Sequence, residues 1–369
     1  MPTEKIIEKA LSRKDLSLEE TKALLEIESA KELEFLYQSA DSLRASLCGN
    51  IVTYVKNRNI NFTNICRNKC KFCAFRKDSS DEKSYCMSID EILEKINPNE
   101  ITEVCIQGGL NEDLNLDYYI EILNSVKKKY PFIHIHAFSP MEIFFLAEKS
   151  GKTVAEILRI LKENGLDSMP GTAAEILSDD VRMEICPEKL SVNQWIDVIK
   201  CAHKTGIPTT STIMFGHIES TLHIAKHLHI VKSIQKETMG FTEFVPLPFV
   251  SKNTRLAKER QIRKEENNNL IYKVYAVSRL LFGNLIRNIQ ASWVKIGVEG
   301  VKKALSLGVN DIGGTLGEEK ISKAAGAIFG ESLSENELKD IILSAGKTPL
   351  QRDTLYRPVE RQKYIHQRV

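Results

Sequence analysis

Residues 59–73 read NINFTNICRNKCKFC, a short β-type run followed at once by three cysteines. The run NINFTN is rich in residues that favour strands and alternates in polarity, so it predicts a strand over 59–64. Cys66, Cys70 and Cys73 follow it on a loop, within eight residues of one another. Three soft thiolates in so short a loop suit an iron–sulfur cluster far better than a site for a hard cation.

The cysteine spacing also bears on what the cluster would do. No fourth cysteine follows at the spacing of a ferredoxin, and Cys86 lies thirteen residues beyond Cys73. We therefore expect one iron to lack a cysteine ligand, and an open metal position is where chemistry takes place. A ferredoxin-like electron carrier would need a fourth thiolate. The remaining alternatives are a structural zinc site and three incidental cysteines.

Seven further short runs rich in Ile, Val, Phe and Thr follow along the chain, most of them before an amphipathic stretch. This alternation is typical of parallel strands joined by crossover helices, and eight such units predict an α/β (β/α)8 barrel of the TIM type. Glycines, cysteines and polar residues gather just after the runs, where such barrels carry their active sites. The seven runs lie at 101–107, 131–138, 166–169, 208–215, 241–247, 288–293 and 309–313.

Helix starts carry a common sequence device, in which Ser or Thr is followed three residues later by Glu or Gln. This capping-box pattern predicts helices that begin after Ser17, Ser88, Thr153, Ser191 and Ser334. We expect an N-terminal helical extension over 1–50, the barrel over 51–330, and a C-terminal helix and tail packing on the barrel over 331–369.

The composition is that of a soluble enzyme, with 42% hydrophobic and 27% charged residues. A net charge of +2 gives no reason to expect nucleic acid as a partner. The charged N-terminus has no signal-peptide pattern, and no segment approaches the length of a membrane span. We expect a cytoplasmic protein without a membrane partner, whose cysteines bind metal rather than form disulfides.

The stretch CRNKCKFCAF at 66–75, with Phe72 before the third cysteine, resembles the CxxxCxxC motif of the radical S-adenosylmethionine (SAM) superfamily. That resemblance implies a 4Fe-4S cluster whose open iron chelates the amino and carboxylate groups of SAM. An electron from the cluster would then cleave the sulfur–C5′ bond and give a 5′-deoxyadenosyl radical, while the protein orients the fragments and excludes water.

The same resemblance implies which residues meet the cofactor. Gly108 and Gly109 look like the glycine motif that contacts the methionine amino group, and a Cβ at Gly108 is expected to fill that space. A plain turn after a strand is the alternative. Ser139, Glu142 and Glu219 fall where related enzymes bind the ribose and methionine ends, although each carboxylate could instead favour a helix start.

Polar residues near the strand ends are candidates for substrate contacts, because such barrels bind their substrates where several strands end. His134 and His136 share one face of a strand and could equally be hydrogen-bonded core residues. His223, His227 and His229 follow helical spacing only in part, so we expect them at the surface and without a metal. The substrate candidates are Asn61, Thr63, His136, Thr172, Glu175, Gln290, Ser292, Asn310 and Thr315.

Longer stretches resemble the branch of the superfamily that holds the second subunit of FO synthase (CofH) and two menaquinone enzymes of the futalosine pathway. GTAAE at 171–175, NIQASWVKIG at 288–297, GGTLGEEKISKAAGA at 313–327 and QRDTLY at 351–356 point toward CofH. This implies transfer of the 4-hydroxybenzyl group of L-tyrosine to C5 of 5-amino-6-(D-ribitylamino)uracil, in coenzyme F(420) biosynthesis. The implied partners are an electron donor and the ring-closing FO synthase subunit 1. No single catalytic residue is assigned.

One stretch departs from the CofH pattern. After EFVPLPF the chain reads VSKNTRLAKER at 250–260, and the part from Asn253 to Leu256 resembles the menaquinone branch. A futalosine-type substrate carries an aromatic carboxylate, and we expect Arg255 to offer the cationic contact for it. An aminofutalosine synthase or a dehypoxanthine futalosine cyclase is therefore the alternative function.

Overall fold

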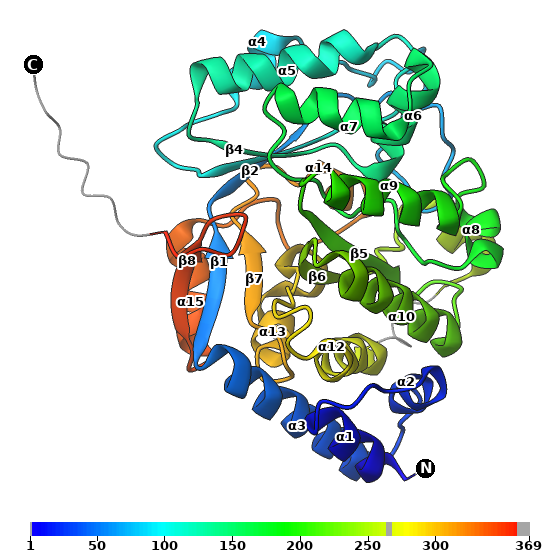
Figure 1. Cartoon of the computed structure of the whole chain (residues 1–369), viewed down its shortest axis with the longest axis vertical. Coiled ribbons are helices and arrows are strands. Elements are labelled where there is room, and N and C mark those ends of the chain that lie inside the picture. The colour runs from blue at the N-terminus through cyan, green and yellow to red at the C-terminus, as the bar shows by residue number, and fades with distance from the viewer. Residues whose placement is uncertain (1, 263–267, 360–369) are drawn as a thin grey trace, which may run out of the picture.

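The computed structural model describes residues 2–262 and 268–359, which form a ring of parallel strands surrounded by helices (Figure 1). β2 pairs with β3 and β3 with β4, and β5 pairs with β6, all in parallel register. Single parallel bridges at Ser168, Met169, Ile289 and Gln290 join these groups to one another and to β7. The strands are β2 (Asn57–Asn61), β3 (Glu103–Gln107), β4 (His134–Ala137), β5 (Thr209–Phe215), β6 (Phe241–Pro248) and β7 (Asp311–Gly314).

The ring closes at a strand that was not predicted from the sequence. β1 (Ile51–Val55) pairs with β7 and leads, after Lys56, into β2, which pairs with β3. Backbone hydrogen bonds from Thr315 to Val55 and from Asn59 to Leu316 complete the closure. All eight predicted runs therefore lie in the barrel wall, and the predicted (β/α)8 fold is confirmed.

The helices begin where the capping boxes predicted. Ser17, Ser88, Thr153, Ser191 and Ser334 each accept a hydrogen bond from the backbone three residues on, and that residue's side chain bonds back. The outer helices are α4 (Ile89–Glu94), α5 (Leu116–Lys129), α6 (Pro140–Ser150), α7 (Val154–Glu163), α8 (Asp179–Ile185), α9 (Val192–Lys204), α10 (Thr221–Thr238), α11 (Arg255–Arg260), α12 (Asn268–Phe282), α13 (Trp293–Ala304), α14 (Lys320–Ala325) and α15 (Glu335–Ser344).

Three N-terminal helices precede the barrel: α1 (Thr3–Leu11), α2 (Leu18–Leu25) and α3 (Ala30–Cys48). They lie together at one end of the molecule beside α12 (Figure 1). Their apolar faces are buried through residues such as Ile7, Leu24 and Leu36, which belong to the main core. This segment therefore extends the hydrophobic core beyond the barrel wall.

The C-terminal region contains a strand as well as the predicted helix. β8 (Thr348–Arg352) pairs in parallel with β1, outside the ring of predicted strands. Its sequence, TPLQR, contains Pro349 and lacks apolar alternation, so it gives no strand signal. Proline is tolerated because β8 has one neighbouring strand, and its other edge needs no backbone donor. Residues 360–369 of the predicted tail lie outside the described residues.

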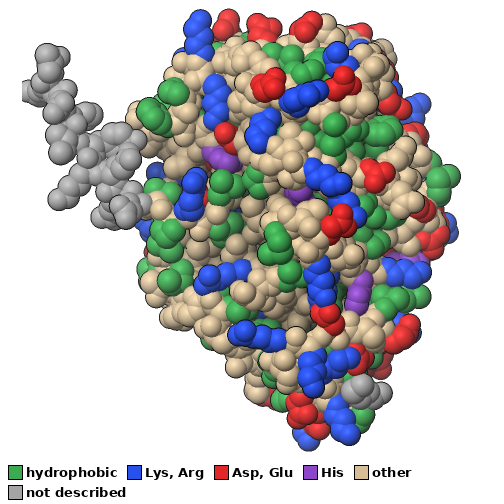
Figure 2. All heavy atoms as spheres, viewed as in Figure 1, with side chains coloured by type: hydrophobic (Ala, Val, Ile, Leu, Met, Phe, Trp, Pro, Cys, Tyr) green, Lys and Arg blue, Asp and Glu red, His purple; other side chains and the backbone are tan. Residues whose placement is uncertain are grey.

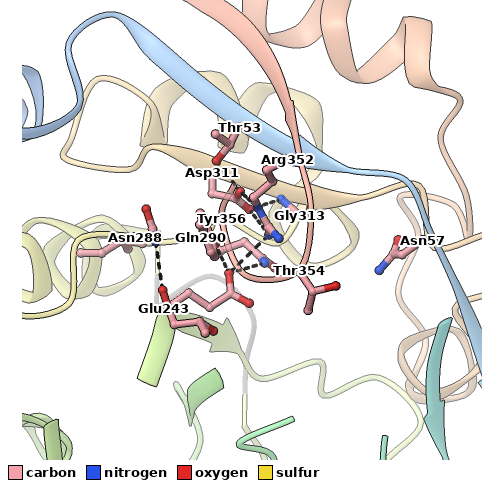
Figure 3. Close-up of polar contacts among 12 residues, drawn as sticks. Thr53, Asn57, Glu243, Asn288, Gln290, Asp311, Gly313, Arg352, Thr354 and Tyr356 are labelled. Carbon is pink, nitrogen blue, oxygen red and sulfur yellow. Dashed lines mark hydrogen bonds and ion pairs between the residues drawn. The ribbon is translucent and has the colours of Figure 1, made fainter. Parts of the chain in front are cut away.

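The end of β8 and the segment after it close the amino-terminal end of the barrel with polar and charged side chains (Figure 3). The buried Arg352 donates from Nε to Asp311 Oδ2 at 2.5 Å and from Nη2 to Asp311 Oδ1 at 3.1 Å. The Tyr356 hydroxyl donates to Glu243, and the Thr354 hydroxyl donates to Glu103 at 2.5 Å. Because Glu103 and Asp311 begin their strands, this network forms the floor of the barrel.

Arg352→Met should destabilise the protein by about 3–5 kcal/mol, because it leaves the Asp311 carboxylate buried without its partner. Urea unfolding at neutral pH measures the change. Arg357→Met is the matched control, since Arg357 makes a similar ion pair with Asp353 but its side chain is 71% exposed. We expect the control to change stability by less than about 1 kcal/mol. Equal effects of the two substitutions would contradict a structural role for the floor network.

The expectation that His223, His227 and His229 lie at the surface is wrong for His227. This side chain is fully buried, with Nδ1 accepting a hydrogen bond from the Leu177 amide at 3.1 Å. It shares a face of α10 with Ile224, Leu228 and Val231, which are also buried, at the spacing of a helical stripe. Burial lowers the pKa of His227 to about 3.

A buried neutral histidine makes stability depend on pH. The folded chain binds fewer protons at this site than the unfolded chain between pH 6.5 and about 3, so stability falls as the pH falls through that window. His227→Asn keeps an acceptor near the position of Nδ1 and removes the titration. We expect the loss of unfolding free energy between pH 7 and pH 5 to shrink by about 2 kcal/mol in this variant. Equal losses in both proteins would refute the assignment.

Candidate functional site

The three cysteines lie on the loop after β2 and line one cavity of about 270 Å³, which we call the upper cavity. Cys66, Cys70 and Cys73 are free thiols, and Cys70 is buried. Backbone hydrogen bonds from Cys66 to Lys77 and from Lys71 to Ile185 hold the loop. Burial raises the pKa of both Cys70 and Cys73, while the positive charge of Lys189 acts in the opposite direction.

The geometry of the thiols bears on the kind of metal group that they could hold. Among the described residues, no three His, Cys, Asp or Glu side chains converge closely enough to share a single ion. A structural zinc site needs four converging ligands. In a four-iron cluster each cysteine binds a different iron, so three thiolates can stand further apart on one cavity wall.

The glycine motif adjoins the cysteine loop at the end of β3. Gly108 and Gly109 both line the upper cavity. A Cβ at Gly109 would lie 2.2 Å from the Ile65 carbonyl oxygen, so this glycine allows the loop that carries Cys66 to pack against β3. A Cβ at Gly108 would lie 2.5 Å from the Phe62 ring. The expectation that it would fill cofactor space is therefore wrong, because that position points into the core.

Ser139 and Glu142 belong to the upper cavity and also form a capping box at the start of α6. Glu142 Oε2 accepts hydrogen bonds from the Ser139 amide and hydroxyl at 2.7 Å, and Oε1 accepts one from the Gly108 amide at 3.0 Å. Burial raises the pKa of Glu142 to about 7 against the effect of these donors. The Glu142 side chain thus joins the glycine motif to α6. Its role in the capping box confirms the interpretation of Glu142 as a residue of the helix start.

Glu219 is placed differently from the other predicted cofactor residues. Its buried carboxylate accepts hydrogen bonds from the Gly216 and His217 amides and lies 3.0 Å from His217 Nδ1. It lines neither cavity described here. The carboxylate holds the turn after β5, because it satisfies the backbone amides two and three residues before it.

A second cavity of about 280 Å³, the lower cavity, lies between the upper cavity and the barrel floor. The two cavities share five lining residues, so they adjoin each other inside the barrel. The shared residues are Gln107, Thr172, Leu247, Lys295 and Ile321. Glu103, Glu243, Arg352 and Thr354 of the floor network also line the lower cavity, which therefore presents both hydrogen-bond donors and acceptors.

The structure brings six of the nine predicted substrate residues to these cavities. Asn61, Thr172 and Glu175 line the upper cavity, and His136, Gln290 and Ser292 line the lower one, which Thr172 also reaches. His134 and His136 both hydrogen-bond to Ser168 Oγ at 2.7 Å, so the core interpretation holds for this pair even though His136 lines the cavity.

Three predicted substrate residues line neither cavity. The Thr63 hydroxyl is buried and donates to the Tyr85 carbonyl, and the Thr315 hydroxyl donates to the Asn57 carbonyl at 2.6 Å. Asn310 precedes β7 and therefore lies at the opposite end of the barrel, where its side chain accepts from Arg279 at 2.7 Å. The directions of these three side chains are set by hydrogen bonds that the strand pattern alone does not reveal.

The expectation that Arg255 supplies the cationic contact at the site is also wrong. Arg255 lies on α11, is 54% exposed and donates to the Lys69 carbonyl. The cations that line the upper cavity include Lys189, which pairs with Glu175 at 2.5 Å, and Lys295. Lys295 follows directly on the predicted strand 288–293, and this position at a strand end was the available sequence signal.

Comparisons with known proteins agree with this geometry. The family model of the radical SAM superfamily matches residues 60–231, and that of the CofH/MqnC C-terminal region matches residues 238–365. Methylornithine synthase (PylB) superposes with a TM-score of 0.74 over 93% of this chain and 97% of its own, at 18% identity. The hydrogenase maturase HydG gives 0.74 over 96% of this chain and 76% of its own, at 17% identity. The chain belongs to the radical SAM superfamily.

Relatives that match almost the whole chain indicate which family within the superfamily it belongs to. The 5-amino-6-(D-ribitylamino)uracil--L-tyrosine 4-hydroxyphenyl transferase of Methanocaldococcus jannaschii is 51% identical over 98% of this chain and 100% of its own. The transferase of that name from Methanothermobacter thermautotrophicus is 46% identical over 97% of this chain and 98% of its own. The chain is a member of the family of these transferases.

Gly109→Ala should lower the iron content after anaerobic reconstitution to less than about half, because the Ile65 backbone must move away from the new Cβ. Iron and sulfide per chain are the readout. Gly346→Ala is the control, since no atom lies within 4 Å of the new Cβ, and its φ of +70° strains the backbone far from the cysteine loop. Normal iron content in Gly109→Ala would show that the close approach to the cysteine loop is dispensable.

Proposed function

We propose that Cys66, Cys70 and Cys73 hold a 4Fe-4S cluster and that SAM binds beside it in the upper cavity. Three free thiols and the Gly108–Gly109 backbone face one space, which is the observation that carries the proposal. When bound, the cluster and SAM supply the radical chemistry of the superfamily. The chain's own residues fit these groups, since Lys189 places positive charge near Cys70 and Phe72 forms part of the cavity wall.

The overall reaction that we propose is transfer of the 4-hydroxybenzyl group of L-tyrosine to C5 of 5-amino-6-(D-ribitylamino)uracil, with release of 2-iminoacetate. Support comes from relatives that carry this transferase name and match almost the whole chain. The ring-closing FO synthase subunit 1 would take the product toward coenzyme F(420), and an electron donor would reduce the cluster. We place this reaction in the cytoplasm.

The lower cavity suits the ribityl-bearing substrate. A ribityl chain has several hydroxyl groups that both donate and accept hydrogen bonds. Gln290, Ser292 and His136 line this cavity together with carboxylates of the floor, so donors and acceptors are both present. Leaving such groups unpaired is costly, and a substrate that lacks the hydroxyls would be rejected for that reason.

Two further observations concern the surface. No helix among the residues described has the length and apolar character needed to cross a membrane. On the face shown in Figure 2, Lys and Arg side chains are interspersed with Asp and Glu, and they form no large patch of one sign. Small molecules are the substrates that we propose, on the evidence of the two cavities inside the barrel.

Cys70→Ala should lose the brown cluster absorbance and all detectable product, because a three-cysteine site cannot spare one thiolate. The assay offers L-tyrosine and the diaminouracil to anaerobically reconstituted protein with SAM and a reductant. Cys86→Ala is the matched control, since Cys86 is exposed and lines neither cavity. Turnover of aminofutalosine precursors, or no consumption of tyrosine by the unmodified protein, would replace this function by the menaquinone alternative.

A further inference from the structure

Lys295 stands at the junction of the two cavities. It lines both of them and belongs to the first turn of α13, directly after the barrel segment that contributes Gln290 and Ser292. A side chain in this position can reach a ligand that spans the boundary between the cofactor and the ribityl-bearing substrate. No other Lys or Arg lines both cavities among the residues described.

The charge of Lys295 is not neutralised by a direct partner. Within residues 2–262 and 268–359, its ammonium group has no hydrogen-bond or ion-pair partner. The other buried cations around the cavities do have one, since Lys189 pairs with Glu175 and Arg352 with Asp311. Lys295 is half-buried and lines both cavities without a counter-charge, so an anionic ligand there would be stabilised by its ammonium group. Burial lowers the pKa of Lys295, while Glu319 and Glu175 act in the opposite direction.

The chemistry of the substrates identifies the anion. This step rests on the proposed function. The diaminouracil substrate carries no permanent negative charge, and the carboxylate of SAM would be bound to the open iron. The carboxylate of the amino-acid substrate is the remaining anion. We propose that Lys295 binds this carboxylate and so fixes the amino-acid backbone at the junction of the two cavities.

The surroundings of Lys295 fit a zwitterion. Glu319 lines the lower cavity and lies close enough to act on the charge of Lys295, so a negative group is available for a substrate ammonium. Glu319 is itself held by Asn59, which donates to Oε2 at 3.0 Å, and by the Ser322 amide, which donates to Oε1 at 2.7 Å. An amino acid held between Lys295 and this carboxylate would place its Cα between the cofactor and its acceptor, where a transferred fragment has the shortest path.

Equilibrium binding separates this role from a structural one. Radiolabelled L-tyrosine is dialysed against cluster-loaded protein with SAM and the diaminouracil but without reductant, so that no turnover occurs. Lys295→Met should weaken tyrosine binding by about 10- to 100-fold, the usual effect of losing a hydrogen bond to a charged group. Lys295→Arg should restore part of the affinity. Tyramine, which lacks the carboxylate, should bind the unmodified protein and Lys295→Met equally.

Two controls test whether the loss of tyrosine binding is specific to Lys295. Lys302→Met changes another lysine of α13, one that pairs with the exposed Glu299 outside the barrel, and should leave tyrosine binding unchanged. SAM affinity and the thermal midpoint of Lys295→Met should match those of the unmodified protein, because methionine has a similar length and needs no counter-charge.

Each outcome decides a separate claim. Undiminished tyrosine binding by Lys295→Met, or a parallel loss of tyramine binding, overturns the role of Lys295 and leaves the proposed function standing. Failure of the unmodified protein to bind tyrosine overturns the proposed function itself, and the role of Lys295 with it.

Discussion

Barrel closure depends on one continuous segment, from Ile51 to Asn61. Its first half, β1, pairs with β7 and β8, and its second half, β2, pairs with β3. This segment therefore pairs with strands on both sides of the closure. Because β2 runs parallel to β3, the carboxyl ends of these two strands lie side by side. The cysteine loop and the glycine motif follow these two strands, so closure is what places Cys66 next to Gly109. The upper cavity is a consequence of that pairing.

The upper and lower cavities of the barrel are lined by different kinds of chemical groups. Cysteine thiols, backbone groups and Glu142 face the upper cavity, while carboxylates, amides and Arg352 face the lower one. The floor charges are largely satisfied by one another, as Figure 3 shows for Arg352, Asp311 and Glu243. Lys295 stands between the two regions without such a partner. The paired charges of the floor thus stabilise the barrel, whereas the unpaired charge of Lys295 is available to a ligand.

Much of this architecture was predictable from local sequence. Strand runs and capping boxes each depend on residues within a few positions, and the structure contains them where the patterns lie. The cysteine loop and Gly109 were found for the same reason. Side-chain directions at strand ends were not predictable, because one residue of register decides whether Thr63 or Thr315 faces the interior or bonds to a neighbouring backbone. β8 was missed because its pairing depends on a distant partner, and His227 was missed because a polar residue occupied a buried helical stripe.

The position of β8 sets an order for synthesis of the protein. Thr348 pairs with Ile51, so β8 must find a strand that was made much earlier. The strands and helices between them can form contacts with near neighbours while the chain is still growing, but the floor of the barrel forms only after β8 has been made. Contacts between residues so far apart in sequence are slow to form. Until β8 supplies Arg352, the carboxylates of Asp311 and Glu243 would lack this cationic partner.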